Sequence, residues 1–343
     1  MDERAAAGRR ARGLGLAAGR LAPGPYGAIT DVPGVRVGHV TLREPPLLHS
    51  GVTAIVPGDV HPGAPLPAGV FAGNGYGKLV GSTQLAELGA LETPVLLTST
   101  LSAFRAADAL VGWMLERPVC AEVTSLNPVV GECNDGVLSD IRARPVRAEH
   151  VHAALDGAAG GPVAEGCVGA GTGTAALGFK AGVGTASRLV AVGGRDACVG
   201  VLVQANFGGT LRVRGRTVTP ADVGVPGPGA APEAGSCMVV AATDAPLDAR
   251  QLTRVARRAV FALARTGASY GHGSGDYAIA FGVRPGGGPP PDAGLDPLFE
   301  GVMDAVEEAV LNSLLAATTT TGPGGRTRHA LPADRLLRLL GDG

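Results

Sequence analysis

The amino-acid sequence predicts an α+β fold in which helices cover a central β-sheet. Short apolar runs typical of buried strands recur along the chain. From residue 236 onward they alternate with longer amphipathic segments in the order strand, helix, strand, helix. The chain has 343 residues, which is long enough to bury a large core as one big domain or two modest ones.

The first 28 residues give little structural signal. Residues 1–21 are rich in Ala, Gly and Arg, and their one apolar stretch is too short and Gly-broken for a signal peptide. We therefore interpret residues 1–28 as a mobile N-terminal extension and expect order to begin near Ile29. Residues 29–343 are interpreted as a single domain.

The first two thirds of the chain mix strand candidates with glycine-rich segments. Strands are expected at residues 35–40, 51–56, 95–101, 197–205 and 211–218, and an amphipathic helix at Ala103–Leu115. Residues 72–78, 127–140 and 169–174 are interpreted as loops. The glycine-rich loops lack the strand context or the GK[ST] ending of nucleotide-binding loops, so close backbone packing is expected there instead.

The last third has the clearest pattern. A Pro/Gly-rich loop at residues 225–232 leads abruptly into an apolar strand at residues 237–243. A helix over residues 248–266 ends at Gly267, and a glycine-laced turn at residues 271–276 leads into a strand at residues 277–281. A long helix over residues 297–317 completes the series.

Composition excludes several classes of function. The net charge of -1 and the 3% aromatic content give no basic or stacking surface for nucleic acid. No apolar stretch approaches the roughly 20 residues of a membrane span. The five cysteines are scattered and form no CxxC, and no HExxH occurs. We therefore expect a cytoplasmic protein without a metal or other cofactor.

The junction between Gly235 and Ser236 admits two interpretations. In one, a strand simply begins with serine. In the other, this bond is a self-cleavage point, because glycine leaves its carbonyl open to attack and Ser236 Oγ is the adjacent nucleophile. Cleavage would give Ser236 a free α-amine with a pKa of roughly 7.7–8, which can act as the base for its own hydroxyl.

Several motifs along the chain, and the order in which they occur, resemble those of a known family. They lie at residues 29–40, 74–78, 91–94, 131–140, 178–188, 201–208, 235–247, 273–281 and 304–319. The chain resembles the self-processing serine aminopeptidases, the family of the L-aminopeptidase/D-esterase and the β-peptidyl aminopeptidases. The resemblance implies a four-layer αββα sandwich like that of N-terminal nucleophile hydrolases, with different connectivity. It also implies one catalytic domain that cleaves itself into fragments 1–235 and 236–343.

The resemblance assigns roles to five residues. The nucleophile falls on Ser236, and its supporting serine and acid fall on Ser274 and Asp276. The asparagine that stabilises the oxyanion falls on Asn206, and the glutamate that receives the substrate ammonium falls on Glu132. These residue types agree with acyl-transfer chemistry, which needs a nucleophile, a base, an orienting acid and an oxyanion donor.

Two positions depart from the family pattern. Asp276 is one methylene shorter than the glutamate of β-peptide-cleaving relatives, and Val137 stands where some relatives have a tyrosine near the oxyanion site. The assigned residues could instead have purely structural roles. Ser274 and Asp276 could only stabilise a turn, Asn206 could only cap a strand, and Glu132 could be a surface acid.

The implied activity is hydrolysis of the N-terminal residue from short peptides, amino-acid amides or esters through an acyl-enzyme, without a cofactor, by a homo-oligomer of αβ heterodimers. Three alternatives remain: an acyltransferase resembling ornithine acetyltransferase, a hydrolase of amide oligomers, and a non-catalytic binding protein. The acyltransferases use threonine as their nucleophile, so Ser236 argues against the first alternative. A conventional α/β-hydrolase is disfavoured because no GxSxG occurs.

Overall fold

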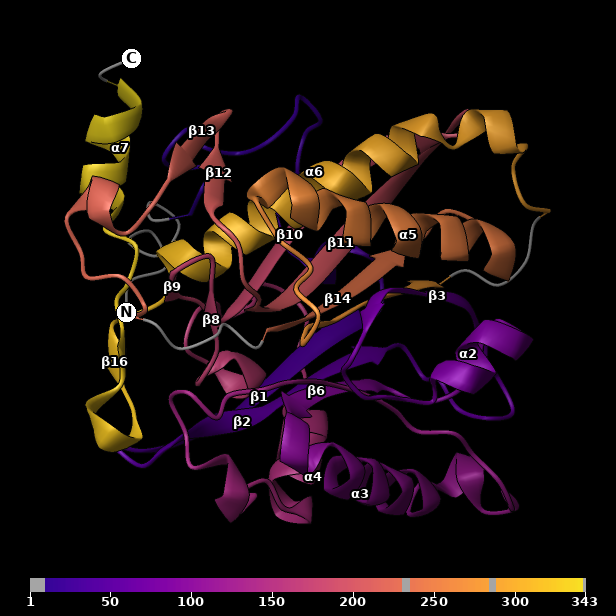
Figure 1. Cartoon of the computed structure of the whole chain (residues 1–343). Coiled ribbons are helices and arrows are strands. Elements are labelled where there is room, and N and C mark those ends of the chain that lie inside the picture. The colour runs from indigo at the N-terminus through magenta and orange to yellow at the C-terminus, as the bar shows by residue number, and fades with distance from the viewer. Residues whose placement is uncertain (1–9, 230–234, 284–287, 342–343) are drawn as a thin grey trace.

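The computed structural model describes residues 10–229, 235–283 and 288–341. Two β-sheets face each other in the middle of the molecule, and helices cover their outer sides (Figure 1). Three buried apolar clusters separate the layers: one between the sheets and one under the helices on each side. The predicted αββα sandwich is confirmed.

The first sheet has the strand order β1-β2-β6-β7-β4. Its strands are β1 (Val35–Glu44), β2 (Leu48–Pro57), β6 (Val95–Ser99), β7 (Val129–Cys133) and β4 (Leu79–Val80). Helices α3 (Ala103–Leu115) and α4 (Ala148–Asp156) cover its outer side. The helix predicted for α3 matches its observed bounds.

The second sheet has the strand order β10-β11-β14-β15-β3-β5. Its strands are β10 (Val183–Val192), β11 (Arg195–Asn206), β14 (Ser236–Thr243), β15 (Gly275–Gly282), β3 (Leu66–Gly75) and β5 (Ala90–Leu91). Helices α5 (Ala249–Thr266) and α6 (Asp296–Leu315) cover it. The strands β14 and β15 run parallel and are joined by α5, as a crossover connection requires.

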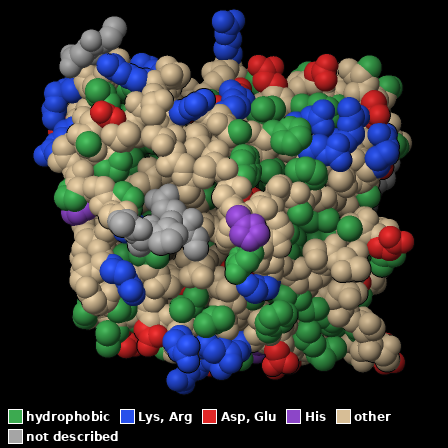
Figure 2. Space-filling view, viewed as in Figure 1, with side chains coloured by type: hydrophobic (Ala, Val, Ile, Leu, Met, Phe, Trp, Pro, Cys, Tyr) green, Lys and Arg blue, Asp and Glu red, His purple; other side chains and the backbone are tan. Residues whose placement is uncertain are grey.

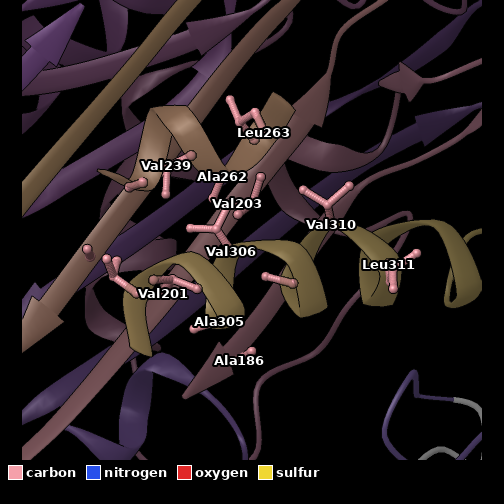
Figure 3. Packing of buried hydrophobic residues seen from close by; sticks show 14 of the residues in the cluster. Ala186, Val201, Val203, Val239, Ala262, Leu263, Ala305, Val306, Val310 and Leu311 are labelled. Carbon is pink, nitrogen blue, oxygen red and sulfur yellow. The ribbon is translucent and has the colours of Figure 1, made fainter. Parts of the chain in front are cut away.

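The central strands of this sheet are apolar on both sides because both of their faces are covered. Along β14, Val239 and Ala241 face the helices, whereas Met238 and Val240 face the first sheet. Figure 3 shows Val239 among side chains of neighbouring strands, α5 and α6 in the outer cluster. Helix α5 begins where Asp248 Oδ1 accepts a hydrogen bond of 2.7 Å from the backbone N–H of Gln251, and it ends at Gly267 with φ of 102°.

The N-terminal segment 10–28 corrects the expectation that order begins near Ile29. Ala11 and Leu16 are buried, and Arg10 forms an ion pair of 2.9 Å with the buried Glu165. Arg12 pairs with Glu308 on α6 at 3.0 Å. Residues 10–28 are therefore packed onto the second sheet and α6, and only residues 1–9 of the expected extension lie outside the described residues.

Three segments differ from their sequence-based interpretation. Most of the 72–78 loop belongs to β3, and residues 129–133 in the first half of the 127–140 loop form the buried strand β7. Residues 211–218 form a small hairpin of β12 (Leu211–Val213) and β13 (Arg216–Val218) instead of one strand. The turn at Arg214 and Gly215, both with positive φ, breaks that alternating run.

Short elements complete the described fold: α2 (Ser82–Leu88), β8 (Ala175–Ala176), β9 (Phe179–Lys180), β16 (Thr320–Thr321), β17 (Thr327–Arg328), α7 (Ala333–Gly341) and isolated 3-10 turns. Among the described residues, we find no helix with both the length and the apolar character needed to cross a membrane. On the face shown in Figure 2, acidic and basic side chains lie in small separate groups among uncharged surface.

Candidate active site

Ser236 is the first residue of β14 and lies at one end of the second sheet. Its backbone is in register with Asn206 on β11 and with Gly275 on β15. Neighbouring strands lie about 4.8 Å apart, so this end of the sheet brings together the segments that carry all four predicted catalytic residues. The prediction that the strands after Ser236 and after Asp276 lie side by side is confirmed.

Asn206 lies beside Ser236 with its amide held in one orientation. By strand alternation, both side chains face the first sheet, on the same side as Met238. Asn206 Oδ1 accepts a hydrogen bond of 3.1 Å from the backbone N–H of Ala175, and Nδ2 donates one of 3.0 Å to the carbonyl of Asn134. An amide nitrogen has two hydrogens, so Asn206 can keep this orientation and still donate to a nearby oxyanion.

Ser274 ends the turn before β15, Asp276 is the second residue of that strand, and the two form a buried pair. Ser274 Oγ donates to Asp276 Oδ1 at 2.8 Å, and the two residues are only 4% and 1% exposed. Burial raises the pKa of Asp276, and the bond from Ser274 partly opposes that shift. The β15 register places Asp276 beside Cys237, on the helix side of the sheet, opposite to the side chain of Ser236. This geometry favours contact of Asp276 with Ser236 through Ser274.

Glu132 lies in the first sheet, on the buried strand β7. It is 2% exposed, which contradicts the alternative of a surface acid. Its Oε1 accepts a hydrogen bond of 2.8 Å from the backbone N–H of Lys78, and its Oε2 accepts one from the hydroxyl of Thr100. A Cβ added to Gly77 would lie 3.2 Å from Glu132 Oε1 and 3.1 Å from Gly275 Cα. Glu132 is thus separated from the Ser236 end of the second sheet by one backbone segment.

Gly235 occupies a position that admits only glycine. A Cβ there would lie 2.6 Å from Phe207 Cα and 2.9 Å from the carbonyl oxygen of Asn206. The carbonyl of Gly235 accepts a hydrogen bond of 3.3 Å from the backbone N–H of Gly275. A small pocket opens beside this residue and is lined by Val137, Gly173, Ala175, Asn206, Phe207, Gly235 and Arg328.

Sequence reasoning missed the residues that hold the turn after β7. Asp135 accepts hydrogen bonds of 2.7 Å from Ser50 Oγ and 2.8 Å from Ser99 Oγ, and burial raises its pKa to about 6. This anchoring fixes the turn whose Asn134 carbonyl orients Asn206. The Asn-Asp-Gly sequence was a visible turn signal, but its partners lie in distant strands.

The described residues hold no group of three or more His, Cys, Asp or Glu side chains arranged to bind a metal ion. All five cysteines are free and buried. Burial raises the pKa of the Cys237 thiol well above its ordinary value, and the neighbouring Asp276 adds to the shift, so this thiol next to Ser236 stays protonated. The Cys237 thiol is therefore poorly suited to act as a nucleophile.

Comparison with known proteins identifies the family of this chain. The family model for Peptidase family S58 matches residues 27–328. The chain is 40% identical over 370 residues to the β-peptidyl aminopeptidase BapA of Sphingosinicella microcystinivorans, covering 98% of this chain and 92% of that protein.

Two solved structures share the fold over nearly the whole chain. A β-aminopeptidase of Burkholderia sp. matches with a TM-score of 0.89 and 40% identity, covering 97% of this chain and 98% of that one. The L-aminopeptidase D-Ala-esterase/amidase of Ochrobactrum anthropi, described as a variant of the Ntn hydrolase fold, matches with a TM-score of 0.85 and 36% identity over the same shares. The chain therefore belongs to Peptidase family S58 and is a serine aminopeptidase, a peptide-bond hydrolase with an N-terminal nucleophile hydrolase fold.

Proposed function

We propose that this aminopeptidase cleaves its own chain between Gly235 and Ser236 and then uses Ser236 to remove the N-terminal residue from short peptides, amino-acid amides or esters. One observation carries the proposal: Ser236 begins a central strand in register with Asn206 and with the turn that holds Ser274 and Asp276. A nucleophile, an oxyanion donor and an orienting acid therefore meet at one end of one sheet.

In the proposed maturation step, Ser236 Oγ attacks the carbonyl carbon of Gly235. The C–N bond breaks, the serine nitrogen takes up the hydroxyl proton, and an ester joins Gly235 to Ser236 Oγ. Water then hydrolyses the ester and leaves a carboxylate on Gly235 and a free amine on Ser236. The N–H of Gly275 already donates to the carbonyl of Gly235 and would stabilise the negative charge that develops there.

In the proposed turnover, the α-amine of Ser236 accepts the proton of its own hydroxyl as Oγ attacks the substrate carbonyl. Asn206 Nδ2 stabilises the oxyanion. The ammonium then protonates the leaving amine, and water releases the acyl group by the same route in reverse. Ser274, bonded to Asp276, holds the α-amine in line with the hydroxyl, as the third member of a triad orients its base.

Glu132 would receive the ammonium group of the substrate. Its carboxylate is fixed by Lys78 and Thr100 and lies one backbone segment from the Ser236 end of the second sheet. A buried carboxylate prefers a cationic partner, so this position selects substrates with a free amino terminus. Such a contact accounts for removal of terminal residues instead of internal cleavage.

We further propose a cytoplasmic homo-oligomer of αβ heterodimers that acts without a metal and has no nucleic-acid or membrane partner. The five free cysteines agree with a reducing compartment. Size-exclusion chromatography with light scattering measures the oligomeric state.

The proposal is tested by mass spectrometry of the purified protein together with hydrolysis of aminoacyl p-nitroanilides. The wild type should give two fragments that meet at Gly235 and Ser236, and Ser236→Ala should give one intact inactive chain. The matured enzyme should hydrolyse free-amine substrates and leave N-acetylated ones uncut. A wild-type chain that stays intact and inactive would instead favour a binding protein of the same fold.

A further inference from the structure

The segment of residues 74–78 connects the two halves of the site. It leaves the end of β3 and reaches β4, so it passes from the second sheet to the first. One of its ends contacts the turn that carries Ser274 and Asp276, and the other contacts Glu132. The contact with Glu132 fixes that carboxylate in the proposed function, whereas the contacts with the turn have no role there.

At the first end, Asn74 binds the backbone of the turn. Its Nδ2 donates to the carbonyls of Gly271 and Ser274, both at 2.7 Å, with the carbonyl of His272 at 3.4 Å. The carbonyl of Ser274 also accepts a hydrogen bond of 3.3 Å from the backbone N–H of Tyr76. One amide therefore uses both of its hydrogens to fix the backbone on either side of residues 272 and 273.

At the other end, the segment is packed between the two sheets. Lys78 N–H donates to Glu132 Oε1 at 2.8 Å, and Tyr277 Oη donates to the carbonyl of Gly77 at 3.0 Å. A Cβ added to Gly275 would lie 2.5 Å from Gly77 Cα, so the backbones of the segment and the turn touch. Movement of the segment would therefore shift the turn and Glu132 together.

The pairing of β3 with β15 explains why Asn74 points at the turn. Asn74 is opposite Asp276 and Ala72 is opposite Tyr277, so Gly73 is an extra residue in β3. Such a bulge bends its strand and redirects the next side chain. A Cβ at Gly73 would lie 2.4 Å from Val260 Cγ1 on α5, so the bulge itself requires glycine.

We propose that Asn74 is a positioning residue for the reaction proposed above. By fixing the 271–276 turn, it sets where Ser274 and Asp276 hold the amine of Ser236 relative to the ammonium site at Glu132. This inference rests on the proposed function. Asn74 acts on the backbone of the turn and does not itself contact the substrate, so it should govern kcat more than KM.

Loss of Asn74 should also be visible in the pH dependence. Among the described residues, the groups whose pKa the charge of Asp276 raises are the thiols of Cys133 and Cys237 and the phenols of Tyr270 and Tyr277, and Ser274 is its hydrogen-bond donor. None of these four groups is cationic, so in the proposed matured enzyme the α-ammonium of Ser236 is the cation that Ser274 and Asp276 hold. In the proposed mechanism the α-amine of Ser236 must be neutral to act as the base, so its pKa sets the acidic limb of the kcat profile. A loosened turn weakens the hold of Ser274 and Asp276 on the ammonium form of that amine, so the acidic limb should move to lower pH.

The test compares Asn74→Ala and Asn74→Asp with Asn127→Ala. Asn127 is a matched control, because its Nδ2 also donates across the chain, to Glu92 Oε1 at 3.0 Å, but outside the site. Each variant is first checked for two fragments by mass spectrometry, and kcat and KM for an aminoacyl p-nitroanilide are then measured against pH. We expect both Asn74 variants to lose kcat by about 10- to 100-fold, as small misplacements of catalytic groups do, with KM within about twofold.

In the same measurement, the acidic limb should move to lower pH for both Asn74 variants and stay in place for Asn127→Ala. A matured Asn74→Ala enzyme with wild-type kcat and an unmoved acidic limb would overturn the inference. If Asn74→Ala does not fold, Asn74→Leu, which keeps the size of the side chain and removes both donors, is measured instead, and wild-type values there overturn it equally. A wild type without aminopeptidase activity would contradict the proposed function and not this inference alone.

Discussion

Replacing Asp276 with asparagine removes the charge of the proposed orienting acid and keeps its size. Its carboxylate is 1% exposed and accepts a bond of 2.8 Å from Ser274. A hydrogen bond to a charged group contributes about 1.5–3 kcal/mol and a neutral one about 0.5–1.5 kcal/mol, so the charge alone accounts for about tenfold in rate. Misorientation of the Ser236 amine adds to this, and we expect kcat to fall on the order of 10²-fold or more. KM should change little, because Glu132 meets the substrate amine.

The same substitution should raise the stability of the folded protein, although it lowers kcat. Burial raises the pKa of Asp276 in the folded protein above its value in the unfolded chain. Stability from this group is therefore present below the ordinary aspartate pKa of about 3.9 and is lost as the pH rises through the folded value. Near pH 7.5, Asp276→Asn should have a higher Tm than the wild type, and the difference should shrink as the pH is lowered toward 4.

The assay combines steady-state kinetics with thermal unfolding of the matured variant. A denaturing gel first checks that the variant has matured into two bands. A loss of turnover is then not confused with a failure to mature. Asp108→Asn, on the exposed side of α3, is the matched control and should leave kcat and Tm unchanged. A matured Asp276→Asn enzyme with near-native kcat would remove this acid from the mechanism and leave Ser236 to act with its own amine alone.

Three further substitutions test other parts of the structure. Glu132→Gln should weaken binding of free-amine substrates by roughly 1.5–3 kcal/mol in kcat/KM, and an unchanged value on an aminoacyl anilide would exclude the ammonium role. Gly235→Ala should slow or stop fragment formation, because the new Cβ would lie 2.6 Å from Phe207 Cα. Gly227→Ala is the control in the same linker and should mature normally, because its Cβ would meet no atom within 4 Å. Arg10→Ala should lower stability by about 3 kcal/mol at pH 8.5, because it leaves the carboxylate of Glu165 buried and unpaired. Since burial raises the pKa of Glu165 to about 7, protonation should reduce that loss at pH 6, and equal losses in thermal unfolding at both pH values would contradict this reasoning.

The part of the fold after Ser236 could be predicted because its signals are local. Apolar side chains on both faces of β14, the cap at Asp248 and the glycine at residue 267 are all visible in the sequence. Parallel pairing then follows from one helical crossover. The sequence therefore predicts that Ser236 and residues 274–276 lie at the same end of the sheet, as the register of β14 and β15 confirms.

Glu132 and the N-terminal segment could not be placed in this way. A glutamate in a short polar segment predicts a loop, because the partners that allow its burial are not visible in the local sequence. Here those partners are a threonine hydroxyl and a backbone N–H from other elements. Residues 10–28 contribute few apolar side chains, and their attachment depends on Arg10 and Arg12 meeting glutamates more than 150 positions away. Local patterns do not contain such long-range pairs.

The strand order of the second sheet has a consequence for the two proposed fragments. β14 and β15 lie between β11 and β3, and both of these outer neighbours precede residue 235 in the chain. Fragment 236–343 would therefore be inserted into the sheet of the other fragment, with a hydrogen-bonded ladder on each side. Separation of the fragments would have to break both ladders and open the apolar layers, so dilution alone should not release them. Once unfolded, the two fragments would separate, so refolding would depend on protein concentration. The lifetime of the active enzyme would then be set by its rate of unfolding.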